Sequence, residues 1–421
     1  MTAVQLAAVL IVLAGIFGAV NYFTLRLPSA IGILVVALLA SLAAMALDAV
    51  VPGSGISDAV RALALDIDFS DALLDWMLGL LLFAGALHVK VEELRAEALP
   101  VALMTTIGVG LSTVIAGAGF SWVTGMPLIA ALVFGALITP TDPVAVLGVL
   151  RQANLRPSLE VQIAGESLFN DGVAYVVFLL LVGIAFPSGA HHAEGWQDVA
   201  LLFLREAVGG ALLGAALGWL TFRLVRRIDD YALEVLLTLG LALGGYELAV
   251  ALHMSGPIMA VVAGLFIGHV GVKHGMSEQT REYLDKFWEI VDELLNAILF
   301  LMIGVEVFAI TFDRPLVIAG LVAILLSLTA RLAAVSVPVA ILKAFREQPG
   351  DVIPIMTWGG LKGGISVALA LSLPDSEWKP QILTATYIVV VFSIIVQGLT
   401  VEKLARRLTV PAQDDIEGLG R

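Results

Sequence analysis

Residues 137–177 read LITPTDPVAVLGVLRQANLRPSLEVQIAGESLFNDGVAYVV, and this stretch places Asp142, Glu166 and Asp171 within two apolar runs. If the second run enters a membrane near Val161, a rise of about 1.5 Å per residue puts Asp171 roughly 15 Å deep, near the middle of a ~30 Å hydrocarbon core. A charge at that depth costs about 2.5–3.5 kcal/mol on insertion scales. These acids are therefore expected to face a cavity or partner side chains, not lipid.

Oxygen-bearing side chains crowd adjacent faces of one predicted helix in the second run. Glu166 and Asn170 are spaced i, i+4, and so are Ser167 and Asp171, which brings the four within about a turn and a half. Oxygen ligands suit hard cations and not soft metals. The spacing therefore predicts a site for a hard cation inside the membrane.

The first run is interrupted at Thr141-Asp142-Pro143. Pro143 has no backbone N–H, and its ring disfavours helical backbone at Asp142, so carbonyl groups are freed at mid-membrane. Irregular backbone at that depth is tolerated where it lines water or a site. We therefore expect this break to lie beside the cation site.

The composition identifies a polytopic membrane protein whose main partner is the lipid bilayer. Of 421 residues, 59% are hydrophobic and only 14% are charged, against roughly 25% charged residues in soluble domains. The absence of cysteine excludes disulfides and thiolate metal sites. A formal charge of −13 argues against nucleic acid as a partner. No cofactor is expected, only a transported cation and H⁺.

Apolar runs of about 17–25 residues predict an all-α fold with about thirteen transmembrane helices. The boundary between the eighth and ninth spans, at residues 251–257, is open, because it reads either as a tight turn or as a bend within one long segment. The predicted spans begin near Val4, Ala30, Ala72, Leu99, Pro127, Val161, Leu201, Tyr231, Ser255, Phe287, Pro315, Val352 and Gln381.

The distribution of basic residues gives an orientation for these spans. Of the 23 Lys and Arg residues, seventeen fall in loops on the side of the C-terminus, four fall on the other side, and Arg331 and Lys362 lie within spans. Because cytoplasmic loops carry an excess of Lys and Arg, the C-terminus is expected in the cytoplasm and the N-terminus outside.

A second interrupted span is predicted at residues 357–365, which read TWGGLKGGI, in the twelfth run. The first interruption lies in the fifth run, so an odd number of spans separates the two, and the two broken helices cross the membrane in opposite directions. Inverted repeats with broken helices are typical of secondary transporters with alternating access. The alternative is a chance match, since Gly-rich membrane helices are common.

Arg331 lies within the apolar run 321–339. A buried guanidinium keeps its charge and needs an acidic partner, and Glu166 is the best candidate. The alternative is that Arg331 lies near an end of its span and extends its side chain to the membrane surface.

The motifs Thr141-Asp142-Pro143 and Gly165-Glu166-Ser167-Leu168-Phe169-Asn170-Asp171-Gly172 closely resemble those of the monovalent cation:proton antiporter-1 family, the sodium/proton exchangers with their NhaP-type members. The resemblance covers nearly the whole chain. Further stretches that look like later helices of that family, in the same order, are Ser255-Gly256-Pro257, Leu295 to Phe300 with Gly304, Ala330-Arg331-Leu332 and Trp358 to Leu371.

The resemblance implies a homodimer of thirteen-helix protomers in a bacterial plasma membrane. Each protomer would have a core, ion-translocating domain including about residues 99–186 and 315–405. The remaining spans would form a dimerisation or scaffold domain. The core would carry two crossed, discontinuous helices, spans 5 and 12.

Site residues follow from the same resemblance. Asp171 would bind either the cation or the proton, and the Ser167 hydroxyl and the Thr141 main-chain carbonyl would complete the monovalent-cation site. Asn170 would steady this site.

The resemblance also implies charge compensation within the core. Asp142 would offset the positive N-terminal ends of the half-helices and Lys362 the negative C-terminal ends, while Glu166 would pair with Arg331. Two departures stand out: Ala84 occupies a position where many members have an acid, and Lys362 replaces a frequent Arg.

The expected function is secondary, electroneutral antiport of Na⁺, or of Li⁺ or K⁺, against H⁺, serving pH homeostasis and without enzymatic activity. One carboxylate that is either protonated or cation-bound suffices for this exchange. An alternative is cation-coupled symport of a small organic substrate, which would need a larger pocket with more polar anchors. An intramembrane aspartyl protease using Asp142 and Asp171 would leave Asn170 without a role, and a passive channel would not need inverted broken helices.

Overall fold

The computed structural model describes residues 3–51, 77–142, 146, 150, 155–186, 196–271, 276–310 and 313–408, and the regular structure in these ranges is helical. The first half of the chain contributes α1 (Ala3–Val20), α2 (Ser29–Val50), α5 (Leu78–Leu87), α6 (Val91–Ala96), α7 (Ala98–Leu103), α8 (Val109–Thr124), α9 (Leu128–Leu137) and α11 (Pro157–Ala185). The second half contributes α12 (Trp196–Val225), α13 (Tyr231–Ala251), α14 (Gly256–Phe266), α16 (Glu278–Val305), α17 (Arg314–Leu342), α18 (Val352–Trp358), α19 (Gly364–Leu371), α20 (Lys379–Phe392) and α21 (Gly398–Leu408).

Several helices have the length and apolarity to cross a membrane. In the described part of the chain, eight continuous helical segments meet both criteria: Gln5–Leu25, Ser29–Asp48, Ala98–Thr124, Pro157–Ala185, Phe203–Val225, Tyr231–Ala251, Arg314–Leu342 and Lys379–Leu408. Shorter apolar helices are Leu78–Leu87, Leu128–Leu137 and Gly256–Val270. The predicted class, an all-α multi-pass membrane protein, is therefore confirmed. The number of thirteen spans stays a prediction.

The open boundary between the eighth and ninth spans is a tight turn. Helix α13 ends at Ala251, and His253 in the turn has a left-handed backbone, with φ 54°. The next helix, α14, begins at Gly256, where the Ser255 hydroxyl accepts a hydrogen bond from the N–H of Ile258 at 3.3 Å. This cap satisfies one of the free N–H groups of the new helix, so two helices meet here and not one bent helix.

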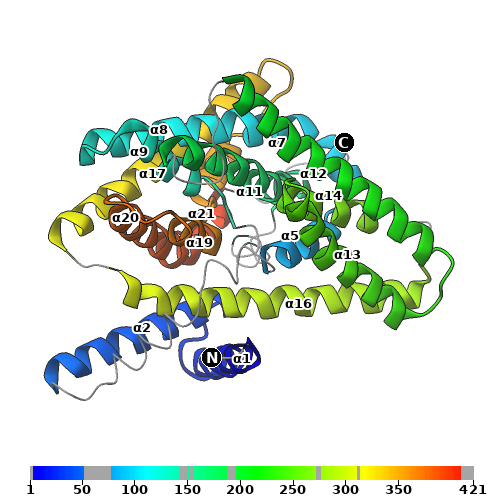
Figure 1. The fold of residues 1–421 in the computed structure, drawn as a ribbon, viewed down its shortest axis with the longest axis horizontal. Helices are drawn as coiled ribbons and strands as arrows, with labels where there is room; N and C mark the ends of the chain where they lie inside the picture. Colours follow the sequence, from blue (N-terminus) through cyan, green and yellow to red (C-terminus); the bar gives the residue numbers. More distant parts are fainter. Residues whose placement is uncertain are drawn as a thin grey trace, which may run out of the picture.

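The helices pack in two groups (Figure 1). On the left of the view, α8 packs against α9 and α17, α17 against α20, and α20 against α19. On the right, α12, α13 and α5 pack around α14. Helix α16 extends beneath both groups and packs against α2 and α5, while α11 contacts α9 of the first group and α12 of the second.

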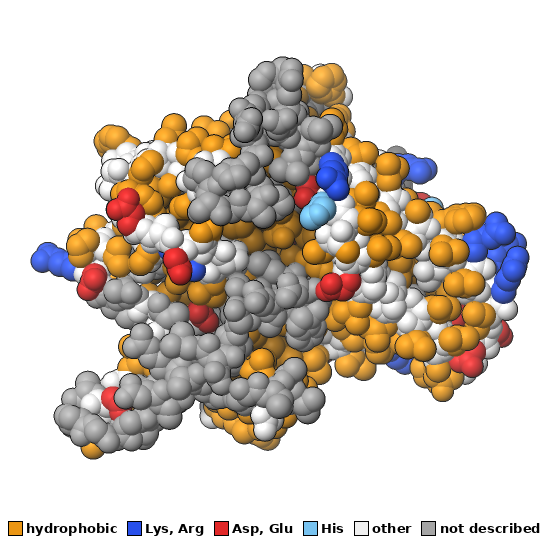
Figure 2. All heavy atoms as spheres, viewed as in Figure 1, with side chains coloured by type: hydrophobic (Ala, Val, Ile, Leu, Met, Phe, Trp, Pro, Cys, Tyr) orange, Lys and Arg blue, Asp and Glu red, His pale blue; other side chains and the backbone are white. Residues whose placement is uncertain are grey.

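The face seen in Figure 2 carries many apolar side chains, as contact with lipid requires. Hydrophobic side chains cover much of the visible face that the structure describes, and Lys and Arg side chains are few on it. Within the first group, α8 and α9 approach so closely that a Cβ on Gly135 would lie 2.2 Å from the carbonyl oxygen of Thr113. Small residues allow this approach in membrane helices.

Candidate functional site

The two interrupted spans meet where their helices stop. After α9 ends at Leu137, residues 139–142 have no regular structure, and residues 360–363 separate α18 from α19 in the same way. The N–H of Asp142 donates a hydrogen bond to the carbonyl of Leu361 at 2.8 Å. A Cβ on Gly363 would lie only 2.9 Å from Cβ of Asp142, so the absence of a side chain permits this approach. The interruptions thus lie against each other, while Pro143, which predicted the first of them, lies outside the described residues.

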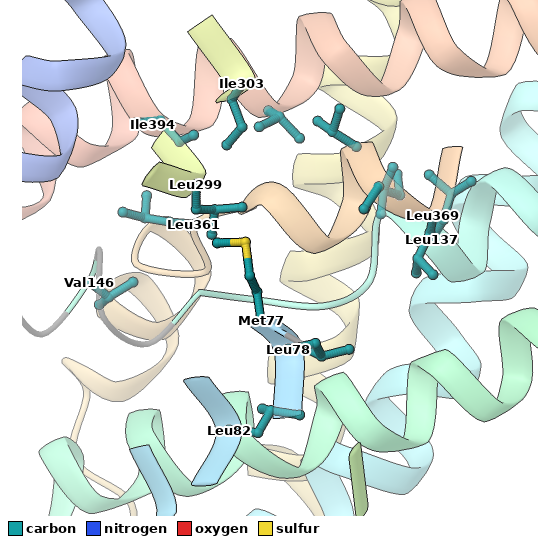
Figure 3. Close-up of a cluster of buried hydrophobic side chains, with 14 of the residues drawn as sticks. Met77, Leu78, Leu82, Leu137, Val146, Leu299, Ile303, Leu361, Leu369 and Ile394 are labelled. Atoms are coloured by element: carbon teal, nitrogen blue, oxygen red, sulfur yellow. The ribbon is translucent and has the colours of Figure 1, made fainter. Parts of the chain in front are cut away.

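Buried apolar side chains pack around residues of both interruptions (Figure 3). Leu361, within the second interruption, belongs to the buried hydrophobic cluster that also contains Met77, Leu299 from α16 and Ile394. Val146, just beyond the first interruption, belongs to it as well. Burial of these side chains anchors both irregular stretches.

Asp171 lies on α11 beside the crossing and is buried, with 4% of its surface exposed. Among the described residues, its Oδ1 has no hydrogen-bond partner. The carboxylate interacts electrostatically with the carboxylates of Asp142 and Glu166 and with the ammonium of Lys362. Because an unpartnered carboxylate oxygen is costly to bury, Asp171 has the capacity to bind a cation or a proton.

Three polar side chains next to Asp171 bond to one another. The hydroxyls of Thr141 and Ser167 are 2.9 Å apart, and Nδ2 of Asn170 donates to Oγ1 of Thr141 at 2.9 Å. The N–H of Thr141 donates to Oδ1 of Asn170 at 3.4 Å. The structure therefore brings together the four residues expected at the cation site, and it connects the first interruption to α11 through Thr141. The resemblance pointed to the carbonyl of Thr141, whereas its hydroxyl and N–H make these contacts.

Glu166 and Arg331 form a buried, bidentate ion pair. Nη2 of Arg331 donates to Oε2 of Glu166 at 2.8 Å, and Nη1 donates to Oε1. Only 6% of Arg331 is exposed, so the alternative in which its side chain reaches the membrane surface does not describe this structure. The same guanidinium donates from Nε and Nη2 to the carbonyl of Met356, at 3.1 and 3.0 Å. Arg331 thus joins α11 and α17 to the end of α18.

Lys362 is buried in the second interruption and points at the first. Its Nζ donates a hydrogen bond to the carbonyl of Thr139 at 3.0 Å, just past the C-terminal end of α9. Carbonyl groups at that end carry partial negative charge. Ala84, at the position where the resembled family often has an acid, is fully buried on α5 and contributes no charge.

Two residues of this neighbourhood were missed by the sequence analysis. Ser393 and Gln397 lie in the last predicted span and form hydrogen bonds with the second interruption. The available signal was their i, i+4 spacing, which puts two polar side chains on one face of an apolar helix.

Comparison with known proteins identifies a matching family and several similar proteins. Residues 5–407 match the family described as "Sodium/hydrogen exchanger, transmembrane". The chain is 44% identical over 416 residues to the Na(+)/H(+) antiporter NhaP of Pseudomonas aeruginosa, a match that covers 96% of each protein. It is 35% identical to the Na(+)/H(+) antiporter NhaH of Halobacillus aidingensis, over 81% of this chain and 84% of that protein.

The fold has a solved counterpart. The sodium proton antiporter MjNhaP1 from Methanocaldococcus jannaschii, determined at pH 8, superimposes with a TM-score of 0.77 at 18% identity, over 96% of this chain and 98% of that one.

Proposed function

Since this chain belongs to the sodium/hydrogen exchanger family, we propose that it exchanges Na⁺ for H⁺ across a bacterial plasma membrane, with Asp171 carrying each ion in turn. The observation that carries the proposal is the buried carboxylate of Asp171, next to the hydroxyls of Thr141 and Ser167. Its Oδ1 has no hydrogen-bond partner among the described residues. Oxygen ligands of this kind suit Na⁺, Li⁺ or K⁺.

The cation and the proton compete for the same carboxylate. Cation binding to Asp171 requires loss of its proton, and protonation expels the cation. Asn170, which bonds to Thr141, cannot titrate, so each cycle moves one monovalent cation against one proton and no net charge. Exchange is then electroneutral.

The remaining residues hold the site and balance its charges. Asp142 offsets the positive N-terminal ends of the broken helices. Lys362 offsets the negative C-terminal end of α9, and Arg331 offsets that of α18. The pair of Glu166 and Arg331 holds α11 against α17. Asn170 fixes Thr141 in place.

The two packing groups support a division of the protein into a mobile core and a scaffold. Helices between about residues 99 and 186 and between 315 and 405 form the mobile core, and the remaining spans form the scaffold. The packing of α8, α9, α17, α19 and α20 with one another is consistent with this division. Movement of the core against the scaffold would expose Asp171 to one side of the membrane at a time.

The protein functions as a homodimer through its scaffold, with the N-terminus outside and the C-terminus in the cytoplasm. Exposed apolar side chains on α12, including Leu212 and Trp219, provide surface for a second protomer or for lipid. The excess of basic residues on the C-terminal side supports the orientation. A C-terminal reporter fusion tests the orientation, and the mass of the protein in lipid nanodiscs tests the dimer.

Inverted membrane vesicles from a bacterial host lacking its own antiporters test the exchange. After respiration has acidified the vesicles, addition of NaCl should dequench a trapped pH dye, and separate additions of LiCl and KCl give the selectivity. Asp171→Asn should abolish the response. The matched control is Asp313→Asn, since Asp313 is exposed and its side chain makes no cap hydrogen bond to α17. Absence of a response to every alkali chloride in the wild type would refute the proposal.

A further inference from the structure

We infer that Ser393 and Gln397 are positioning residues of the exchanger, which hold the interrupted stretch between α18 and α19 so that Lys362 reaches the end of α9. The inference rests on the proposed function for its transport readout. It concerns a span that contributes no side chain to the cation site described above.

The contacts form a continuous chain of hydrogen bonds. The N–H of Lys362 donates to Oγ of Ser393 at 2.9 Å. The Ser393 hydroxyl donates its own hydrogen to Oε1 of Gln397 at 2.7 Å, and Nε2 of Gln397 donates to the carbonyl of Trp358 at 3.0 Å. The network thereby binds both ends of the interruption, Trp358 at the end of α18 and Lys362 just before α19.

The direction of each bond follows from chemistry. A backbone N–H can only donate, so Ser393 must accept from Lys362 and offer its single hydrogen elsewhere. A carbonyl can only accept, so the amide nitrogen of Gln397 must face Trp358 and its oxygen must face Ser393. Each of the three groups therefore fixes the orientation of the next, and the network has one arrangement of donors.

The interruption needs these partners because of where it lies. Both side chains are buried, Ser393 fully and Gln397 with 3% exposed, so water cannot replace them. Backbone groups freed at membrane depth must be satisfied by protein. Arg331 donates to the carbonyl of Met356. Further along the chain, Gln397 donates to the carbonyl of Trp358, and Ser393 accepts from the N–H of Lys362.

The side chains of Ser393 and Gln397 lie in a stretch of the last span with irregular helical geometry. Residues Ser393–Gln397 form a π-helical turn, η6, between α20 and α21, in which the N–H of Gly398 bonds to the carbonyl of Ser393. A π turn widens the helix, and such turns often occur at functional sites. A Cβ on Gly398, the residue after the turn, would lie 2.9 Å from Ile31 of α2 and 3.7 Å from Leu361, so this end of the turn lies near the interruption.

The consequence extends to both halves of the crossing. The ammonium of Lys362 bonds to Thr139, and the carbonyl of Leu361 accepts from the N–H of Asp142. Any displacement of Lys362 therefore shifts the stretch that carries Thr141 into the cation site. Binding of a small ion requires that its ligands be held in place by supporting residues, as Thr141 is here.

The test compares Ser393→Ala with Ser393→Thr and Gln397→Met, with Thr386→Val as the matched control. Thr386 is also buried on the last span, but its hydroxyl donates to the carbonyl of Ile382 in its own helix. Loss of a partner for the buried N–H should raise the apparent KM for Na⁺ about tenfold in Ser393→Ala. Ser393→Thr keeps the hydroxyl and should restore the wild-type KM, and Thr386→Val should leave it unchanged.

A second measurement does not depend on transport. In lipid nanodiscs, amide hydrogen exchange of the peptide containing Lys362 should be faster in Ser393→Ala and Gln397→Met than in the wild type or in Thr386→Val. The inference would be overturned if the folded Ser393→Ala and Gln397→Met variants kept both the wild-type KM for Na⁺ and the wild-type rate of amide hydrogen exchange. Failure of the proposed function would look different: the wild type would move no protons, while amide exchange would still report on the network.

Discussion

The ammonium of Lys362 lies 3.0 Å from the carbonyl oxygen of Thr139, so a cation from one broken span meets the C-terminal end of a half-helix in the other. The corresponding end of α18 is occupied by a different cation, since Arg331 donates to the carbonyl of Met356. The two negative helix ends at the crossing are therefore divided between Lys362 and Arg331. This division determines what substitution of each residue should do.

Substitution of Lys362 should separate charge from shape. Lys362→Arg should retain Na⁺-driven proton movement, because compensation of a helix end requires positive charge and not a particular side-chain geometry. Lys362→Gln should lose transport or lower the Tm of the purified protein. Full activity of Lys362→Gln at an unchanged Tm would remove Lys362 from the mechanism.

Substitution of Arg331 should be more damaging than substitution of Glu166. Breaking a buried ion pair costs about 3–5 kcal/mol, and Arg331→Met also leaves the Met356 carbonyl without its donor. Glu166→Gln keeps that bond. We expect the lowest Tm for Arg331→Met, an intermediate Tm for Glu166→Gln, and partial recovery when both changes are combined. Wild-type stability of Arg331→Met in detergent would contradict the structural role of the pair.

Exchange should not respond to membrane potential. In proteoliposomes, a Na⁺ gradient or a pH gradient alone should drive it, and a potential set with valinomycin should not change its rate. One elementary charge moved across 100 mV is worth about 2.3 kcal/mol, roughly a fifty-fold bias, so net charge movement would be detected easily. A clear dependence on potential would point to Asp142 as a second carrier.

The apparent affinity for Na⁺ should fall as pH falls. Proton and cation compete for the carboxylate of Asp171. In the pH range where this carboxylate is mostly protonated, each further unit of acidification should raise the apparent KM for Na⁺ about tenfold. The maximal rate at saturating Na⁺ should stay the same. Initial rates measured over a matrix of pH and Na⁺ concentration test this. If acidification lowered the maximal rate and left the KM constant, the two ions would not share one site.

Two glycines on α8 should respond differently to alanine. A Cβ on Gly117 would lie 2.7 Å from Cα of Leu132 in α9, whereas a Cβ on Gly110 would meet no atom within 4 Å. Gly117→Ala should lower the Tm by forcing the helices apart. Gly110→Ala should be neutral or stabilise the protein by up to about 1 kcal/mol, because alanine favours helix. Equal Tm values for both variants would show that α8 and α9 do not pack as described.

Local physical chemistry was enough to predict the class of the protein and to single out polar residues that the structure brings together. Hydropathy predicted long apolar helices, and the Gly-rich stretch around Lys362 predicted an interruption, because these signals depend on neighbouring residues. The cost of burying charge in lipid also singled out Asp171, Glu166 and Arg331, and it suggested that the last two are partners.

The tertiary structure decided how these parts fit together. Three sets of hydrogen bonds join residues from different spans. They are the bond from Asp142 to Leu361, the bonds that Thr141 forms through its hydroxyl and N–H, and the network of Ser393 and Gln397. No pattern of hydrophobic or polar residues encodes such pairs, since helices far apart in sequence become neighbours only after packing. A freed backbone group in the membrane must find a partner, and which side chain supplies it depends on the arrangement of the helices in space.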